Sequence, residues 1–182
     1  MKLIITLSLF GALALAACIF SSVNAAVFFP IATNANIINV AGGIASSSSN
    51  YLVGIGQNQT NVCLQLVSSN GALVGSLLTV GAGKGQPRVA FGKTNYLAFW
   101  GDDYISGAID LYGQLVSSSG ATVGPAFPLL QSLGTHGFQS EQAIAFDGTN
   151  FLVVWEGSQF PAASTFYGQF VTPAGVCQVR SF

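Results

Sequence analysis

Apolar residues recur along this chain in short runs that return three times at the same spacing. Each run follows a short apolar segment, a turn and an asparagine, and it holds aromatic and aliphatic residues in nearly unbroken succession. The three runs are Tyr51–Ile55, Tyr96–Trp100 and Phe151–Trp155. Runs of this length between turn residues are typical of β-strands buried on both faces. Repetition at a spacing of about 50 residues predicts an array of equivalent supersecondary units.

The second copy shows how one unit is built. Val89–Phe91 predicts a first strand, and the turn at Gly92–Thr94 leads into a second strand at Tyr96–Trp100. A third strand is expected at Ile109–Val116, and a fourth after the turn at Ser117–Gly120. No stretch after the N-terminal segment has an apolar stripe at helical spacing. The pattern therefore predicts an all-β fold of three tandem four-stranded antiparallel units.

The third copy carries a family resemblance. Phe146–Trp155 is followed by Tyr167–Val171 and then by Pro173–Gly175. This combination resembles a repeat of secreted bacterial proteins whose units, about 50 residues long, are β-propeller-like blades. The second copy matches it well, whereas the first copy is degraded. The resemblance implies blade-like units and no particular activity. Because propellers have about four to eight blades, a β-trefoil or another three-fold closed β fold stays open as the alternative.

These units suggest a division of the chain into a signal peptide and a single all-β repeat domain. The expected boundaries are 1–25 for the signal peptide and 26–182 for the domain, with units at about 32–80, 81–130 and 131–182. The third unit ends soon after its last turn, whereas Phe28–Ile31 has the composition of the missing strand. We therefore expect residues 27–31 to complete the last unit and to lie beside residues 165–182. Such closure would remove exposed strand edges.

The N-terminal segment has the pattern of a signal peptide. Met1 and Lys2 give a positive start, Leu3–Phe20 is almost unbroken apolar sequence, and small residues lead to an expected cleavage after Ala25. About 18 apolar residues is also near the lower limit for a transmembrane helix. The residues before and including Cys18 resemble the lipobox of bacterial lipoproteins. We expect a secreted, extracellular or cell-surface protein, with lipid anchoring at Cys18 as the alternative.

Export would permit two covalent modifications of the mature chain. Cys63 and Cys177 remain after cleavage, and a disulfide between them would join the first and last units. Two buried free thiols are the alternative. Asn58 begins an N-glycosylation sequon, which matters where the host glycosylates.

Charge is scarce in this chain. It has 5 Lys and Arg residues against 6 Asp and Glu, while 51% of its residues are hydrophobic. This balance predicts a folded core rather than disorder. It leaves no basic patch that could bind nucleic acid. It also leaves no polybasic segment that could bind a membrane, so a lipid anchor is the one membrane attachment left open. Near-neutral surfaces favour association, which predicts a homo-oligomer or a fibre.

No residues have the spacing of a catalytic centre, so we expect neither an enzyme nor a cofactor. His136 stands in a loop without the partners of a triad. Asp102, Asp103 and Asp110 could offer oxygen ligands to Ca²⁺, but they lack the spacing of a calcium loop. No metal site is therefore expected.

The recurring aromatic and amide side chains predict packing rather than chemistry. Trp100 and Trp155 occupy equivalent positions, which favours a role in the core over sugar stacking. Gln65, Gln114 and Gln169 recur in the third strands and are expected to satisfy backbone groups between blades. Two functions follow as hypotheses. One is a structural, surface or self-assembling protein, and the other is a carbohydrate- or ligand-binding module that uses the variable loops after each second strand.

Overall fold

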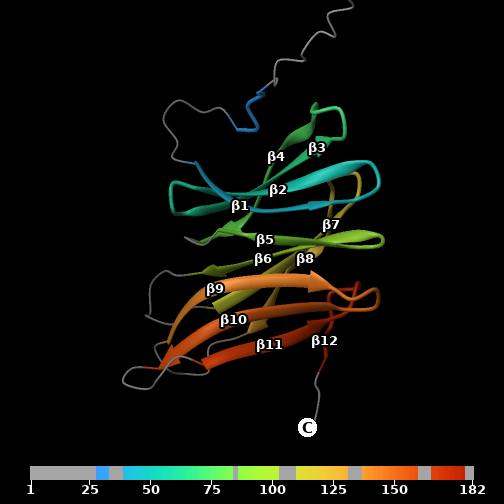
Figure 1. Ribbon diagram of the computed structural model, residues 1–182. Coiled ribbons are helices and arrows are strands. Elements are labelled where there is room, and N and C mark those ends of the chain that lie inside the picture. Colours follow the sequence, from blue (N-terminus) through green and yellow to red (C-terminus); the bar gives the residue numbers. More distant parts are fainter. Residues whose placement is uncertain are drawn as a thin grey trace, which may run out of the picture.

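The computed structural model describes residues 28–32, 39–83, 86–102, 110–130, 137–159 and 165–178, and the regular elements of these ranges are β-strands without helices (Figure 1). The strands are β1 (Asn39–Ser46), β2 (Asn50–Gln57), β3 (Asn61–Ser68), β4 (Leu73–Ala82), β5 (Arg88–Gly92), β6 (Asn95–Asp102), β7 (Asp110–Ser117), β8 (Thr122–Leu130), β9 (Gly137–Phe146), β10 (Phe151–Gln159), β11 (Thr165–Val171) and β12 (Cys177–Gln178). A search of these ranges for a helix that could cross a membrane finds none.

The strands form three four-stranded antiparallel sheets, each with its strands in chain order. We call them the first sheet (β1–β4), the middle sheet (β5–β8) and the third sheet (β9–β12). The predicted all-β fold of three tandem four-stranded units is confirmed. The hydrogen-bonded ladders of the described strands stay within one unit, whereas a closed three-fold barrel would pair strands of different units. The β-trefoil alternative therefore does not describe this chain.

The sheets are stacked face to face, with the middle sheet between the other two (Figure 1). On one side of the middle sheet, Leu52 of β2 packs in a cluster with Tyr96 and Ala98 of β6. On the other side, Leu97 and Phe99 of β6 pack in a cluster that includes Phe151 and Val153 of β10. This arrangement explains why Tyr96–Trp100 is apolar at every position. Burying such a side chain stabilises the fold by about 1.5–3 kcal/mol.

The first strands of successive units also lie close together. The amide of Gly43 in β1 donates to the carbonyl of Pro87, which precedes β5, at 2.6 Å. A Cβ atom at Gly42 would lie only 2.4 Å from the same carbonyl oxygen. The β1 ladder shifts register between Ala41 and Ile44, so these glycines form a bulge. Glycine is required here because the two backbones touch.

A recurring glutamine holds the third and fourth strands of each unit together. Gln65 Nε2 donates to the carbonyls of Leu66 and Val74, at 3.0 and 3.2 Å. Gln114 Nε2 donates to the carbonyls of Leu115 and Gly124 at 2.9 and 3.0 Å, and Gln169 Nε2 donates to those of Phe170 and Gln178 at 2.9 and 2.7 Å. The ladders beside Gln65 and Gln114 shift register at these positions. These amides therefore bond to strands of their own sheet, and the prediction that they satisfy backbone groups between blades is wrong.

The N-terminal residues do not complete the third sheet. Phe29 and Ile31 line a pocket on the first sheet, which is at the opposite end of the stack (Figure 1). The edge of the third sheet beside β11 is occupied by β12, which the chain reaches after the turn at Gly175. The prediction that residues 28–31 lie beside residues 165–178 is wrong, because β12 already fills that edge. Residue 27 lies outside the described residues.

Candidate functional site

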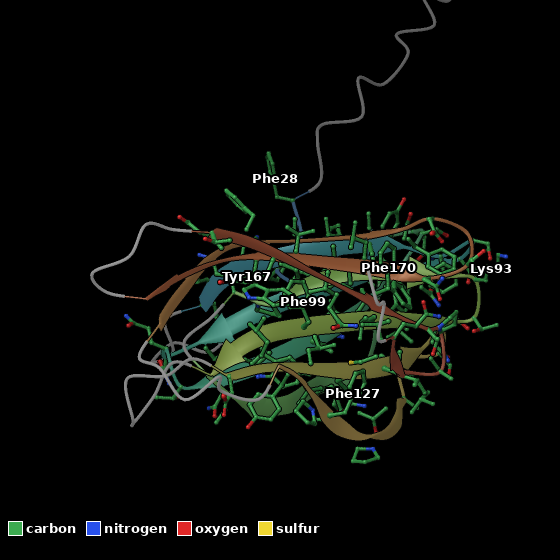
Figure 2. All side chains as sticks on the ribbon, turned by 90° about the horizontal axis from the view of Figure 1, so that it is seen from below. Phe28, Lys93, Phe99, Phe127, Tyr167 and Phe170 are labelled. Carbon is green, nitrogen blue, oxygen red and sulfur yellow. The ribbon has the colours of Figure 1, made fainter. Side chains whose placement is uncertain are left out.

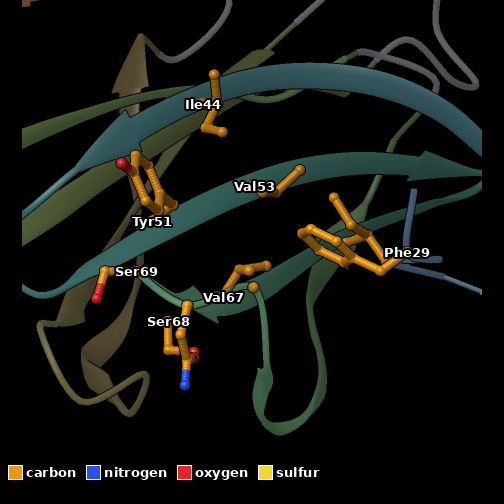
Figure 3. A pocket seen from close by; sticks show the side chains of 10 residues that line it. Phe29, Ile44, Tyr51, Val53, Val67, Ser68 and Ser69 are labelled. Atoms are coloured by element: carbon orange, nitrogen blue, oxygen red, sulfur yellow. The ribbon is translucent and has the colours of Figure 1, made fainter. Parts of the chain in front are cut away.

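A pocket of about 440 Å³ lies on the face of the first sheet that points away from the middle sheet (Figure 3). Apolar side chains and a polar turn surround it. They are Phe29, Ile31, Ile44, Tyr51, Val53, Val67, Ser68, Ser69, Asn70 and Gly71.

The alternation of β2 places this lining. Leu52 points to the middle sheet, so its neighbours Tyr51 and Val53 point outward. Directly opposite them in the ladders are Val67 of β3 and Ile44 of β1. These four side chains form an apolar floor, although Ile44 is 63% exposed and Tyr51 is 42% exposed.

The same four positions exist in the other two sheets, where the preceding sheet covers them. In the middle sheet they are Val89, Tyr96, Ala98 and Val116. In the third sheet they are Ile144, Phe151, Val153 and Val171. The first of these sets packs with side chains of the first sheet, and the second set packs with side chains of the middle sheet. The pocket is thus the repeat surface that no other sheet of the described residues covers.

A turn glycine marks the edge of this surface in every unit. Gly71, Gly120 and Gly175 have φ angles of +84°, +90° and +80°. A Cβ atom at Gly120 would lie 3.2 Å from Leu66 of the first sheet, and one at Gly175 would lie 3.1 Å from Phe127 of the middle sheet. A Cβ atom at Gly71 would lie 3.0 Å from the ring of Phe29. Phe29 therefore takes the place that a preceding sheet fills elsewhere.

Hydrogen bonds add to the apolar contact between the first and middle sheets. The Tyr96 hydroxyl donates to the carbonyl of Asn50 at 2.7 Å and accepts from the amide of Ser47 at 3.2 Å. The Asn50 side chain donates to the carbonyl of Ser118 at 3.0 Å. Tyr51 is the repeat equivalent of Tyr96, and its ring stands on the exposed side of the first sheet.

The far end of the stack presents the other half of the same interface. Leu152 of β10 is equivalent to Leu52 and Leu97, which are 1% and 0% exposed. It points away from the middle sheet and is half-buried, as is Phe170 opposite it in β11. Phe166 on the same face is 67% exposed. The two ends of the molecule therefore carry the two complementary surfaces that pack together twice inside it.

The two cysteines of the predicted disulfide are free. Cys63 is buried in β3 of the first sheet, where its thiol donates to Oε1 of Gln57 at 3.3 Å. Cys177 is half-buried in β12 of the third sheet, and burial raises the pKa of its thiol. The middle sheet lies between their two sheets (Figure 1), and no disulfide joins Cys63 to Cys177.

The other sequence candidates are not brought together into a site. Asn58 is exposed in the β2–β3 turn with a φ of +52°, and its glycosylation stays a prediction. The backbones of Asp102 and Asp110 are paired across β6 and β7. Among the described residues no three His, Cys, Asp or Glu side chains gather as a metal site would require. Cys18, Asp103, His136 and the predicted signal peptide lie outside the described residues.

The two recurring tryptophans pack in the core, as predicted. Trp100 stacks on Tyr112 with ring centroids 6.3 Å apart, and Trp155 stacks on Tyr167 at 6.0 Å. Both tryptophans are buried. The indole nitrogen of Trp100 also donates to the carbonyl of Ala82, at 3.1 Å.

Sequence reasoning missed the pocket, although a signal for it existed. The first of the three described repeats lies at one end of the stack, yet the outward positions of its second strand are still apolar. Comparison with protein-family models, with characterised proteins and with solved structures finds no match for this chain.

Proposed function

We propose that this chain is a secreted, non-catalytic structural protein that assembles with copies of itself through the two end faces of its sheet stack. One observation carries the proposal: the first and third sheets present outward the two complementary halves of the interface that joins the sheets within the chain. Burying an apolar β-surface of this kind against another copy is more favourable than leaving it exposed to water.

The geometry of such assembly is head to tail. A contact between different surfaces of two copies either closes a ring or continues as a filament. Each chain supplies three sheets, so two copies would supply six. A ring of six lies within the range of about four to eight blades found in propellers. The low charge of the chain, with 5 basic and 6 acidic residues, adds little repulsion between copies.

The mass of the purified protein in solution tests this proposal. Static light scattering should show a mass that rises with concentration in whole multiples of the chain. Dilution should reverse the rise, which separates assembly from aggregation. A mass that stays at one chain over the whole concentration range would contradict the proposal.

A ligand-binding module is the second candidate, and the pocket supports it. Its volume of about 440 Å³ lies in the range of about 300–1,000 Å³ that is common for small-molecule sites. The apolar floor favours a ligand with an aromatic or aliphatic group, and the serines of the adjacent turn could contact a sugar hydroxyl. Binding on a glycan array, or its absence with the fold intact, tests this candidate.

A further inference from the structure

We infer that the pocket on the first sheet is the docking site for the third sheet of a second copy, and that Phe29 blocks one position of this site in the free chain. The inference rests on the proposed self-assembly. It assigns the surface through which two copies bind and the residue that limits this binding.

The register of docking follows from the two interfaces inside the chain. In each of them the central leucine of one sheet, Leu52 or Leu97, packs on the four-residue floor of the next sheet. The corresponding leucine at the end of the stack is Leu152, and the corresponding open floor surrounds Tyr51 and Val53. Leu152 of a second copy therefore fits the pocket in the register that the chain already uses twice.

Polar contacts are expected to follow the same register. Between the first and middle sheets, the Tyr96 hydroxyl binds the turn that ends at Asn50. The equivalent turn of the third sheet ends at Asn150, where the Asp147 side chain accepts from the amides of Thr149 and Asn150, both at 2.7 Å. This turn would lie against the Tyr51 hydroxyl of a second copy.

Phe29 occupies one position in this docking surface. Leu66, which covers Gly120, lies opposite Leu52 in its sheet, and the residue in the same position in the third sheet is Phe170. A second copy in this register would place Phe170 over Gly71. The ring of Phe29 already lies there (Figure 3). The two rings exclude each other, so docking requires residues 28–32 to move away.

The neighbouring phenylalanine supplies a matched control. Phe28 is 93% exposed and projects away from the strands (Figure 2), whereas Phe29 is 45% exposed and contacts the sheet. Phe29→Ala and Phe28→Ala remove the same side chain from adjacent positions. A closed site lowers the apparent affinity by the fraction of open molecules. We expect Phe29→Ala to strengthen association by roughly tenfold or more and Phe28→Ala to leave it unchanged.

A second variant tests the opposite surface. Leu152→Asp places a charge where the pocket is apolar, so it should abolish association both alone and combined with Phe29→Ala. Thermal unfolding of each variant shows whether the fold is kept, and Leu152→Lys repeats the test if the aspartate variant does not fold. Sedimentation velocity at matched concentrations measures the association.

The outcomes separate this inference from the proposed function. If the wild-type protein associates but Phe29→Ala behaves like Phe28→Ala, or if both Leu152 variants associate normally, the inference is wrong and the proposed assembly stands. If the wild-type protein stays monomeric, the proposed assembly fails, and if Phe29→Ala stays monomeric as well, the inference fails with it. A monomeric Phe29→Ala variant that gains fluorescence with the apolar dye ANS would assign the pocket to a small ligand and would also overturn the inference.

Discussion

Replacing Tyr96 by phenylalanine removes the hydroxyl that connects the first and middle sheets. The ring of Tyr96 packs on Phe91 with centroids 4.8 Å apart, and the equivalent pair in the third sheet, Phe146 and Phe151, lies at 4.9 Å. Phenylalanine therefore fits this position without rearrangement. The change tests the hydrogen bonds and leaves the packing in place.

The magnitude follows from the two bonds that are lost, one to Asn50 at 2.7 Å and one from Ser47 at 3.2 Å. Each hydrogen bond contributes about 0.5–1.5 kcal/mol net to stability. The amide of Ser47 also donates to the carbonyl of Asn50 at 2.8 Å, so neither backbone group is left without a partner. We therefore expect Tyr96→Phe to lower the free energy of unfolding by about 1–2 kcal/mol.

Urea unfolding, at a concentration where the protein is monomeric, measures this loss. Tyr51→Phe is the matched control, because Tyr51 holds the equivalent position on the open face and is 42% exposed. Its effect on the monomer should stay within about 0.5 kcal/mol. The reasoning is that these repeat-equivalent tyrosines differ only in whether another sheet covers them. Equal effects of the two substitutions, or no effect of Tyr96→Phe, would refute it.

Two further predictions concern close packing and thiol chemistry. A Cβ atom at Gly92 would lie 2.3 Å from the buried ring of Phe151, so Gly92→Ala should destabilise the protein by about 1–3 kcal/mol in thermal unfolding. Gly168→Ala is its control and should cost less, because a Cβ atom there would meet nothing closer than 3.5 Å. Burial raises the pKa of Cys177, so its thiolate forms at higher pH in the folded chain than in the unfolded chain. Alkylation of Cys177, followed by mass spectrometry at about pH 9, near the ordinary pKa of a thiol, should therefore be slower in the folded than in the denatured protein. Equal rates would contradict this. Because the folded chain holds the Cys177 proton more tightly, the contribution of this thiol to the free energy of unfolding is fully present below its unfolded pKa. That contribution is lost as the pH rises through the folded pKa.

The sequence was sufficient to predict the units because their signal is local. The run from Tyr96 to Trp100 is apolar at successive positions, which only a strand covered on both faces requires, and the middle sheet is covered in this way. The tryptophans recur at one repeat position, and both are buried.

Other features depend on contacts that periodicity does not encode. The glutamines were placed between blades because their recurrence does not reveal that the third and fourth strands shift register beside them. The segment that contains Phe29 was assigned to the third sheet from composition alone. A short apolar segment fits any open apolar face, and only the strand pairing of β12 shows that the place beside β11 is already taken.

Photo-cross-linking tests the contact between two copies most directly. Tyr51→p-benzoylphenylalanine places a photoreactive ring at the pocket, and mixing isotopically heavy and light copies distinguishes links between chains from links within one chain. We predict mixed-isotope cross-links from position 51 to the peptide that contains Asp147 and Leu152. Cross-links confined to single chains, or directed to any other part of the second copy, would contradict head-to-tail docking of the sheets.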